Sequence, residues 1–218
     1  MSKSKKVVII DYQLGNLFSV KQACDAVGIN AELSHDKEAI ASADAIILPG
    51  VGAFKEAMEN LSKLELVSSL REFASTMKPV FGVCLGQQLL FTESEEFENC
   101  YGLDLIPGVI KRFDNLNASP KFKVPQIGWN QIEVPNKREW DNTPLQSLNA
   151  KEFMYFVHSY YVKPENDDVV CSNTNYGNVS YCSSVLHSNI FSTQFHPEKS
   201  GEKGLTIYKN WAIQNNII

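Results

Sequence analysis

The sequence predicts an α/β protein with a central, mostly parallel sheet flanked by helices and a strand-rich C-terminal half. Apolar runs of strand length recur early in the chain, at 7–10, 45–48 and 80–83. Helical patterns separate these runs, and such alternation favours a parallel sheet. With 44% apolar residues among 218, the chain can bury one full core. We therefore expect a single domain over residues 1–218.

The first helix is expected between the first two apolar runs. Its apolar face is formed by residues at helical spacing: Leu17, Val20, Ala23, Cys24 and Val27. The pattern stops at Gly28, a residue type that commonly ends helices. A second helical pattern follows the third run and covers 85–91. Ligand groups collect at the carboxyl ends of parallel strands, so functional residues are expected just after 48 and 83.

The second half of the chain is expected to be largely strand. Apolar and alternating segments with loops between them lie at 109–113, 130–134, 154–157, 179–186 and 190–195. A final helix follows, with Leu205, Tyr208, Trp211 and Ala212 on one face. That face is expected to pack back on the sheet.

Charge and cysteine content exclude several classes of function. The net charge is -5, from 20 basic and 25 acidic residues without long runs of either sign, which argues against a nucleic-acid partner. The apolar segment at 7–10 is too short for a secretory signal or a membrane span, so a cytoplasmic protein without a membrane partner is expected. Five cysteines without a C-x-x-C pair argue against a disulfide framework and a zinc site. No metal or cofactor is expected.

Cys84 is the candidate nucleophile. It stands between an apolar strand and a helical pattern, with Gly82 and Gly86 two positions away on either side. A sharp strand-to-helix turn needs small neighbours and displays its central side chain, and a helix N-terminus favours a thiolate. The alternative is a small buried hydrophobe. The glycine pair favours the nucleophile, and the other four cysteines are expected to be structural.

His196 is the candidate base, with Glu198 as its orienting carboxylate. Pro197 biases the preceding residue toward extended geometry, in which side chains two apart point to the same side. A carboxylate bound to one ring nitrogen would leave the other facing the thiol. The alternative is a simple turn at a strand end. His158 has no carboxylate two positions away and is expected beside the site, while His35 and His187 are expected to be structural or solvated.

An oxyanion hole is predicted from two backbone segments. The N–H of Leu85, directly after the nucleophile, supplies one donor. A second donor is expected from Val51 or Gly52, in the loop after the strand at 45–48, because neighbouring glycines allow the peptide to turn. Ordinary turn chemistry is the alternative explanation of this loop.

Three of these segments together resemble the class I glutamine amidotransferases. They are Gly82-Val83-Cys84-Leu85-Gly86, the loop 49–52 and Gln194-Phe195-His196-Pro197-Glu198. The resemblance implies a flavodoxin-like fold, a Cys84–His196–Glu198 triad and hydrolysis of L-glutamine through a cysteine thioester.

Further segments extend the resemblance to glutaminase subunits of histidine biosynthesis. They lie at 11–16, 49–54, 124–130, 156–160 and 196–201. This implies a heterodimer with a TIM-barrel cyclase that receives the ammonia.

The resemblance also implies roles for six further residues. Gln88 and Glu96 would hold the head groups of glutamine, and the backbone of Ser159 and Tyr160 would line the same pocket. Asn16 and Lys199 would lie at the interface with the cyclase.

Three glutamines depart from the pattern of these subunits, and two alternative functions stay open. Gln13, Gln87 and Gln126 stand where glycine, an apolar residue and histidine are commoner. The same glutaminase chemistry could serve a partner that aminates a sugar in surface polysaccharide synthesis; the neighbouring genes would decide. The chain could also be a non-catalytic binding subunit, which labelling of Cys84 by a glutamine-analogue electrophile would test.

Overall fold

The fold is taken from a computed structural model, which describes residues 5–96, 100–115, 118, 120–135 and 139–218. Five parallel strands form the N-terminal part of the sheet in the order β2-β1-β3-β4-β13. They are β1 (Val7–Ile10), β2 (Ala31–Ser34), β3 (Ala45–Leu48), β4 (Val80–Val83) and β13 (Ile190–Thr193). The predicted parallel sheet is confirmed here.

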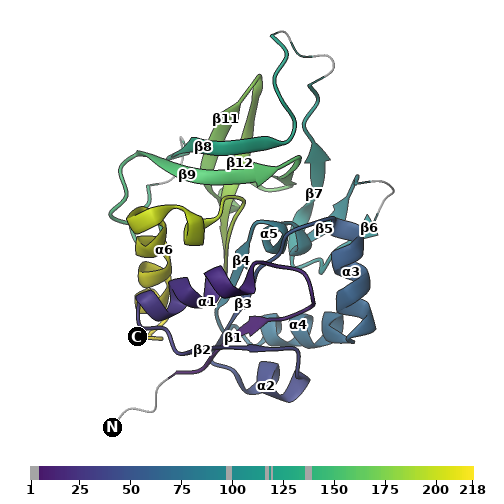
Figure 1. Cartoon of the computed structure of the whole chain (residues 1–218), viewed down its shortest axis with the longest axis vertical. Coiled ribbons are helices and arrows are strands. Elements are labelled where there is room, and N and C mark those ends of the chain that lie inside the picture. The colour runs from purple at the N-terminus through teal and green to yellow at the C-terminus, as the bar shows by residue number, and fades with distance from the viewer. Residues whose placement is uncertain (1–4, 97–99, 116–117, 119, 136–138) are drawn as a thin grey trace.

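The sheet continues beyond β13 with mainly antiparallel strands. In sheet order they are β12 (Val179–His187), β10 (Tyr160–Pro164), β7 (Ile106–Arg112), β5 (Phe91–Ser94) and β6 (Cys100–Tyr101). Three further strands branch from β12: β11 (Val170–Tyr176), β8 (Gln126–Glu133) and β9 (Lys151–His158). We call β8 and β9 the ribbon; it stands above the parallel strands in Figure 1.

Helices cover both faces of the parallel strands (Figure 1). They are α1 (Leu17–Ala26), α2 (Lys37–Ser42), α3 (Phe54–Lys63), α4 (Leu66–Ser75), α5 (Leu85–Leu89) and α6 (Gly201–Gln214). Two short 3-10 turns, η1 (Asp167–Val169) and η2 (Pro197–Lys199), complete the described elements. Strand side chains alternate between two cores: Val8 and Ile10 face the side of α2 to α4, whereas Val7 and Ile9 face α1 and α6.

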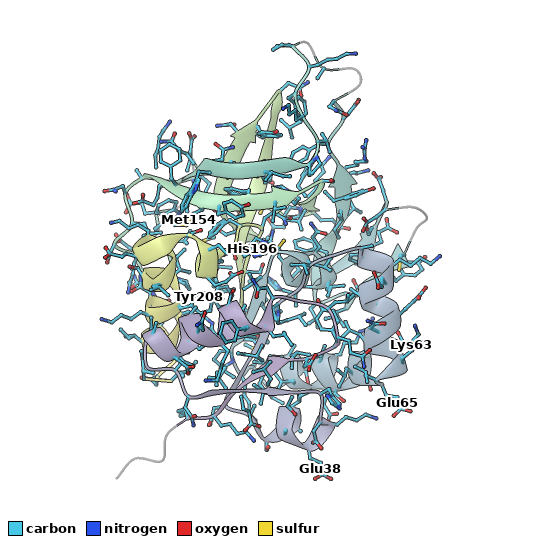
Figure 2. All side chains as sticks on the ribbon, in the orientation of Figure 1. Glu38, Lys63, Glu65, Met154, His196 and Tyr208 are labelled. Carbon is cyan, nitrogen blue, oxygen red and sulfur yellow. The ribbon has the colours of Figure 1, made fainter. Side chains whose placement is uncertain are left out.

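The division between interior and surface follows residue chemistry. Tyr208 of α6 and Met154 of β9 are fully buried, while Glu38, Lys63 and Glu65 project outward (Figure 2). Burial on both faces explains why β1 and β3 are continuously apolar and do not alternate.

The expected helix ends are partly wrong. The first helix ends before Gly28, which has φ +84, as predicted. The helical pattern at 85–91 was expected to be one helix, but α5 stops at Leu89 and Phe91 begins β5. Pairing of Phe91 with Ile106 of β7 buries that ring completely, so strand pairing overrides the local helical pattern.

Gln87 on α5 leads to the first testable expectation. Its side chain is fully buried, and neither amide atom has a hydrogen-bond partner among the described residues. Since an unsatisfied buried amide costs about 1–3 kcal/mol, Gln87→Met is expected to raise the free energy of unfolding by about 1 kcal/mol. Urea denaturation checks this, and a lower unfolding midpoint in the variant would contradict it.

Candidate active site

Cys84 occupies a strained corner between β4 and α5. Its φ is 55° and its ψ is -109°, and its N–H donates to the carbonyl oxygen of Thr193 at 2.7 Å. A Cβ on Gly86 would lie 1.7 Å from the carbonyl oxygen of Leu48, and one on Gly82 would lie 2.7 Å from a methyl of Leu90. The two glycines therefore permit the close approach that exposes the thiol at the carboxyl end of the sheet.

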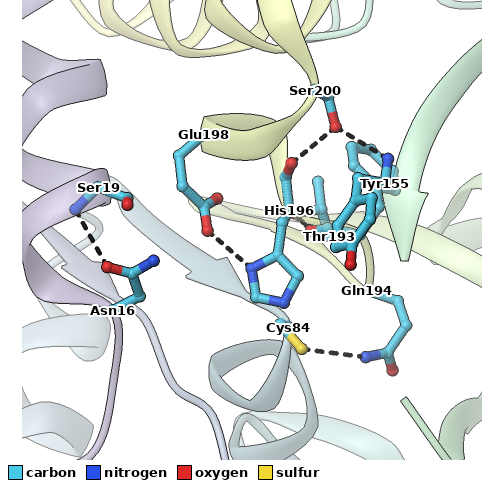
Figure 3. A network of polar contacts seen from close by, with 10 residues as sticks. Asn16, Ser19, Cys84, Tyr155, Thr193, Gln194, His196, Glu198 and Ser200 are labelled. Carbon is cyan, nitrogen blue, oxygen red and sulfur yellow. Dashed lines mark hydrogen bonds and ion pairs between the residues drawn. The ribbon is translucent and has the colours of Figure 1, made fainter. Parts of the chain in front are cut away.

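His196 and Glu198 form a buried pair beside this corner. Nδ1 of His196 lies 2.7 Å from Oε1 of Glu198, and the two side chains are only 2% and 1% exposed. Figure 3 shows the imidazole directed toward the sulfur of Cys84. Burial alone lowers the pKa of His196, but the neighbouring Cys84 sulfur and Glu198 carboxylate outweigh burial and raise it. The imidazolium is thus stabilised between two groups that carry negative charge when ionised.

His196 itself is extended, as expected (φ -100, ψ 94), but the backbone that follows it is not. β13 ends at Thr193, and Pro197–Lys199 form the 3-10 turn η2 with His196 at its N-terminal boundary. Proline favours the first position of a helical turn because its φ is already suitable. The turn is tied down on both sides: Ser200 Oγ donates to the His196 carbonyl, and the His196 N–H donates to the Tyr155 carbonyl. The carboxylate therefore reaches the ring through a tight turn.

One predicted donor of the oxyanion hole already makes a hydrogen bond within the protein. The N–H of Leu85 donates to the carbonyl oxygen of Gly50 at 3.4 Å. The peptide between Gly50 and Val51 thus turns its oxygen, and not its N–H, toward the Leu85 N–H. Gly52 has φ +105, and a Cβ built there meets nothing within 4 Å, so the adjoining loop has room to turn.

A cavity of about 340 Å³ opens beside the sulfur. Its lining includes Cys84 together with the four predicted substrate residues, Gln88, Glu96, Ser159 and Tyr160. These residues come from α5, the end of β5 and the junction of β9 with β10. The structure therefore brings these four residues to the same cavity as Cys84.

Two polar side chains of the cavity wall are already bonded to backbone. Oε2 of Glu96 accepts a hydrogen bond from the N–H of Phe54 at 2.6 Å, and burial raises its pKa. Nε2 of Gln88 donates to the carbonyl oxygen of Tyr160 and to Oε1 of Gln194, both at 3.0 Å. The wall is consequently held in place before any ligand enters.

His158 lies in the lining, as expected for a residue beside the site. Its ring nitrogens lie 2.8 Å from the Tyr160 carbonyl oxygen and 3.1 Å from the Tyr181 hydroxyl. Burial lowers its pKa to about 4, against an opposing effect of the Tyr160 carbonyl. His158 is therefore neutral at neutral pH and holds the pocket backbone without carrying charge.

The two predicted interface residues lie next to His196 and Glu198. Asn16 caps α1 by accepting from the Ser19 N–H at 3.3 Å, and it lies beside Glu198 (Figure 3). Lys199 is exposed on η2. Tyr181 and Gln194, which contact the site, were not selected from the sequence, because their contacts depend on strand pairing.

Metal-ligand clusters and membrane-spanning helices are both absent from the described ranges. No group of three or more His, Cys, Asp or Glu there could hold a metal ion. In the same ranges, no helix combines the length and apolarity needed to cross a bilayer.

Comparison with known proteins gives concordant matches. The family model "Glutamine amidotransferase class-I" matches residues 8–215. "Imidazole glycerol phosphate synthase subunit HisH" of Syntrophotalea carbinolica is 44% identical over 208 residues, which cover 94% of this chain and 98% of that protein. The same subunit of Methanosarcina barkeri is also 44% identical, with 95% and 98% covered.

Solved structures are similar in fold. PurLQS of Thermotoga maritima superposes with a TM-score of 0.72 at 19% identity, and covers 97% of this chain and 99% of its own. A second solved structure, of a glutamine amidotransferase, also gives 0.72, at 17% identity, with 96% and 98% covered.

Proposed function

The chain belongs to the class I glutamine amidotransferases, and from this premise we propose that it is the glutaminase subunit of an imidazole glycerol phosphate synthase. It hydrolyses L-glutamine to L-glutamate and ammonia in histidine biosynthesis. The observation that carries the chemistry is the placement of Cys84, His196 and Glu198 together beside the cavity. The relatives carry the HisH name, so a sugar-aminating partner is not favoured.

The proposed reaction has two halves. The Cys84 thiolate attacks the side-chain amide carbon of glutamine, and a tetrahedral oxyanion forms. His196 protonates the amide nitrogen, the carbon–nitrogen bond breaks, and ammonia leaves a thioester. Water then gives a proton to His196 and attacks the thioester, which releases glutamate and restores the thiolate. Glu198 holds the imidazole in orientation throughout.

The cavity wall suggests how glutamine is held. Glu96, two residues after the end of β5, lines the cavity. Its carboxylate is suited to accept hydrogen bonds from the α-amino group of glutamine. Backbone groups of Ser159 and Tyr160 also line the cavity and are suited to the substrate's polar ends. Gln88 keeps the Tyr160 carbonyl in place.

The apolar face of the ribbon is the proposed docking surface for a TIM-barrel cyclase. Ile127, Trp129 and Phe153 are 63%, 57% and 51% exposed. Register places Ile127 opposite Val157 and Trp129 opposite Tyr155, so all five side chains share one face of the ribbon. Exposed apolar surface of this kind marks an interaction site. Val157 also lines the cavity, so a partner docked here would sit at the cavity mouth.

The remaining partner assignments follow from this placement. Tyr155 bonds to Ser200, next to the turn η2 that carries Lys199, and η2 also contacts α1, whose N-cap is Asn16. Ammonia released at Cys84 would pass directly to the partner. There it would be incorporated to give imidazole glycerol phosphate and aminoimidazole carboxamide ribotide.

Identification of the partner tests this proposal. Affinity capture of the intact chain from its native cell extract is expected to recover a TIM-barrel cyclase, and the pair with glutamine is expected to release glutamate. Capture of a sugar-modifying synthase would overturn the histidine assignment. Absence of glutamate release from the captured pair would overturn the glutaminase assignment.

Substitution in the ribbon tests the docking surface. Trp129→Ala is expected to weaken binding of the cyclase by about 30-fold in Kd, because large central aromatic side chains dominate interface energies. Isothermal titration calorimetry gives the constant. Ile213→Ala removes an exposed apolar side chain from α6, outside the proposed surface, and is the matched control. Equal affinities for the two variants would contradict the assignment.

A further inference from the structure

Gln194 is brought beside the nucleophile by strand register. Thr193, the last residue of β13, pairs with Val83, the last residue of β4, in parallel. The next residues, Gln194 and Cys84, therefore leave the sheet side by side. Gln194 is fully buried, and its Nε2 donates to the sulfur of Cys84 at 3.8 Å (Figure 3).

The direction of this amide is determined by its other contacts. The carbonyl oxygen of Tyr160 can only accept, so Gln88 must turn its Nε2 toward it at 3.0 Å. The same Nε2 lies 3.0 Å from Oε1 of Gln194, which is thereby the accepting end. The donating end of Gln194 is left facing the sulfur. Reversal of its amide would place two acceptors, oxygen and sulfur, against each other.

We propose that Gln194 is a further catalytic residue, whose amide N–H holds the reacting sulfur of Cys84 and stabilises its anion. This deepens the proposed function and rests on it. His196 and Gln194 lie in the same connection after β13, and their side chains approach the sulfur from different sides, so the thiolate receives donors from two directions. The chain from Tyr160 through Gln88 and Gln194 also ties the cavity wall to the nucleophile.

The first test measures how fast Cys84 reacts with iodoacetamide, a small amide electrophile. In the full-length Gln194→Met variant, which keeps the length and loses the donor, alkylation of Cys84 at neutral pH is expected to slow about tenfold. Peptide mass spectrometry follows each cysteine separately. Partly exposed Cys100 serves as an internal reference and is expected to react at an unchanged rate.

Gln87→Met is the matched control variant. Gln87 is equally buried and lies on the helix that follows Cys84. No hydrogen bond joins its side-chain amide to any described residue. Its Cys84 alkylation rate is expected to equal that of the wild type. Wild-type reactivity of Cys84 in Gln194→Met would overturn the proposal, as would equal slowing in the two methionine variants.

Gln194→Glu keeps the shape of the side chain and makes the Cys84 alkylation rate depend on pH, which a change in packing alone would not do. At neutral pH the new carboxylate would repel the thiolate, so Cys84 alkylation relative to the wild type is expected to fall further than in Gln194→Met. At mildly acidic pH the new carboxyl is protonated and can donate, so part of the deficit is expected to be recovered. A rate ratio that does not vary with pH would overturn the proposal.

Glutamine kinetics with the partner complete the test. Gln194→Met is expected to lower kcat about tenfold while KM for glutamine stays unchanged, because the donor acts on the nucleophile and not on the substrate. Alkylation requires no glutamine turnover. A wild-type chain without glutaminase activity would therefore refute the proposed function, whereas the alkylation series would still decide the role of Gln194.

Discussion

Cys84→Ser is expected to lower kcat for glutamine hydrolysis by about 10,000-fold or more in the partner-bound enzyme. The change replaces one atom at the strained corner, so the backbone, the cavity and the His196–Glu198 pair stay in place. A serine hydroxyl is far less ionised than a thiol. The His196–Glu198 pair is arranged to stabilise a thiolate and does not activate the hydroxyl in the same way. Binding of glutamine is expected to persist, because Glu96, Ser159 and Tyr160 are untouched.

Coupled detection of glutamate gives the rate, and thermal unfolding confirms that the variant is folded. Cys100→Ser is the matched control, since Cys100 lies on β6 at the sheet edge and lines no part of the cavity. That variant is expected to retain wild-type turnover. Substantial glutamate release by Cys84→Ser would mean that another group attacks the amide.

Addition of the cyclase is expected to raise the glutaminase rate of the free chain by about 100-fold or more. In the free chain the Leu85 N–H is bonded to the Gly50 carbonyl, so a developing oxyanion would find one donor occupied and face the oxygen of the Gly50–Val51 peptide. Loss of one such donor typically costs about 100- to 1,000-fold in kcat. Rotation of the Gly50–Val51 peptide would release the Leu85 N–H from the Gly50 carbonyl oxygen. The same rotation would turn the Val51 N–H toward the oxyanion.

The increase is measured as glutamate release with and without a saturating concentration of the partner. Trp129→Ala is expected to need a higher partner concentration for the same maximal increase. If the free chain already turned over at the rate of the complex, the occupied Leu85 donor would not limit the reaction.

The sequence was most informative where short-range chemistry decides the structure. The apolar runs at 7–10, 45–48 and 80–83 became strands with unchanged bounds, and two glycines around Cys84 were enough to indicate the corner. Both depend on neighbours within a few positions. Burial on both faces of a parallel strand leaves a continuous apolar run that can be recognised locally.

Features that depend on pairing between distant segments were not predicted. β11 contains Ser172, Asn173 and Asn175, which have low strand propensity, yet β12 on one side and β8 on the other hold it in the sheet. The contact of Gln194 with Cys84 joins residues 110 positions apart and follows from strand register alone. The His196–Glu198 contact was expected, but from extended geometry, whereas a 3-10 turn makes it.

Tyr155 gives the ribbon a second consequence. Its ring lies 6.1 Å from that of Trp129 on the docking face, while its carbonyl accepts the His196 N–H at 2.9 Å and its own N–H donates to Ser200. Tyr155 thus belongs both to the proposed docking surface and to the backbone that holds His196. Docking of a partner on the ribbon would therefore act on the backbone that supports the His196 imidazole, through Tyr155.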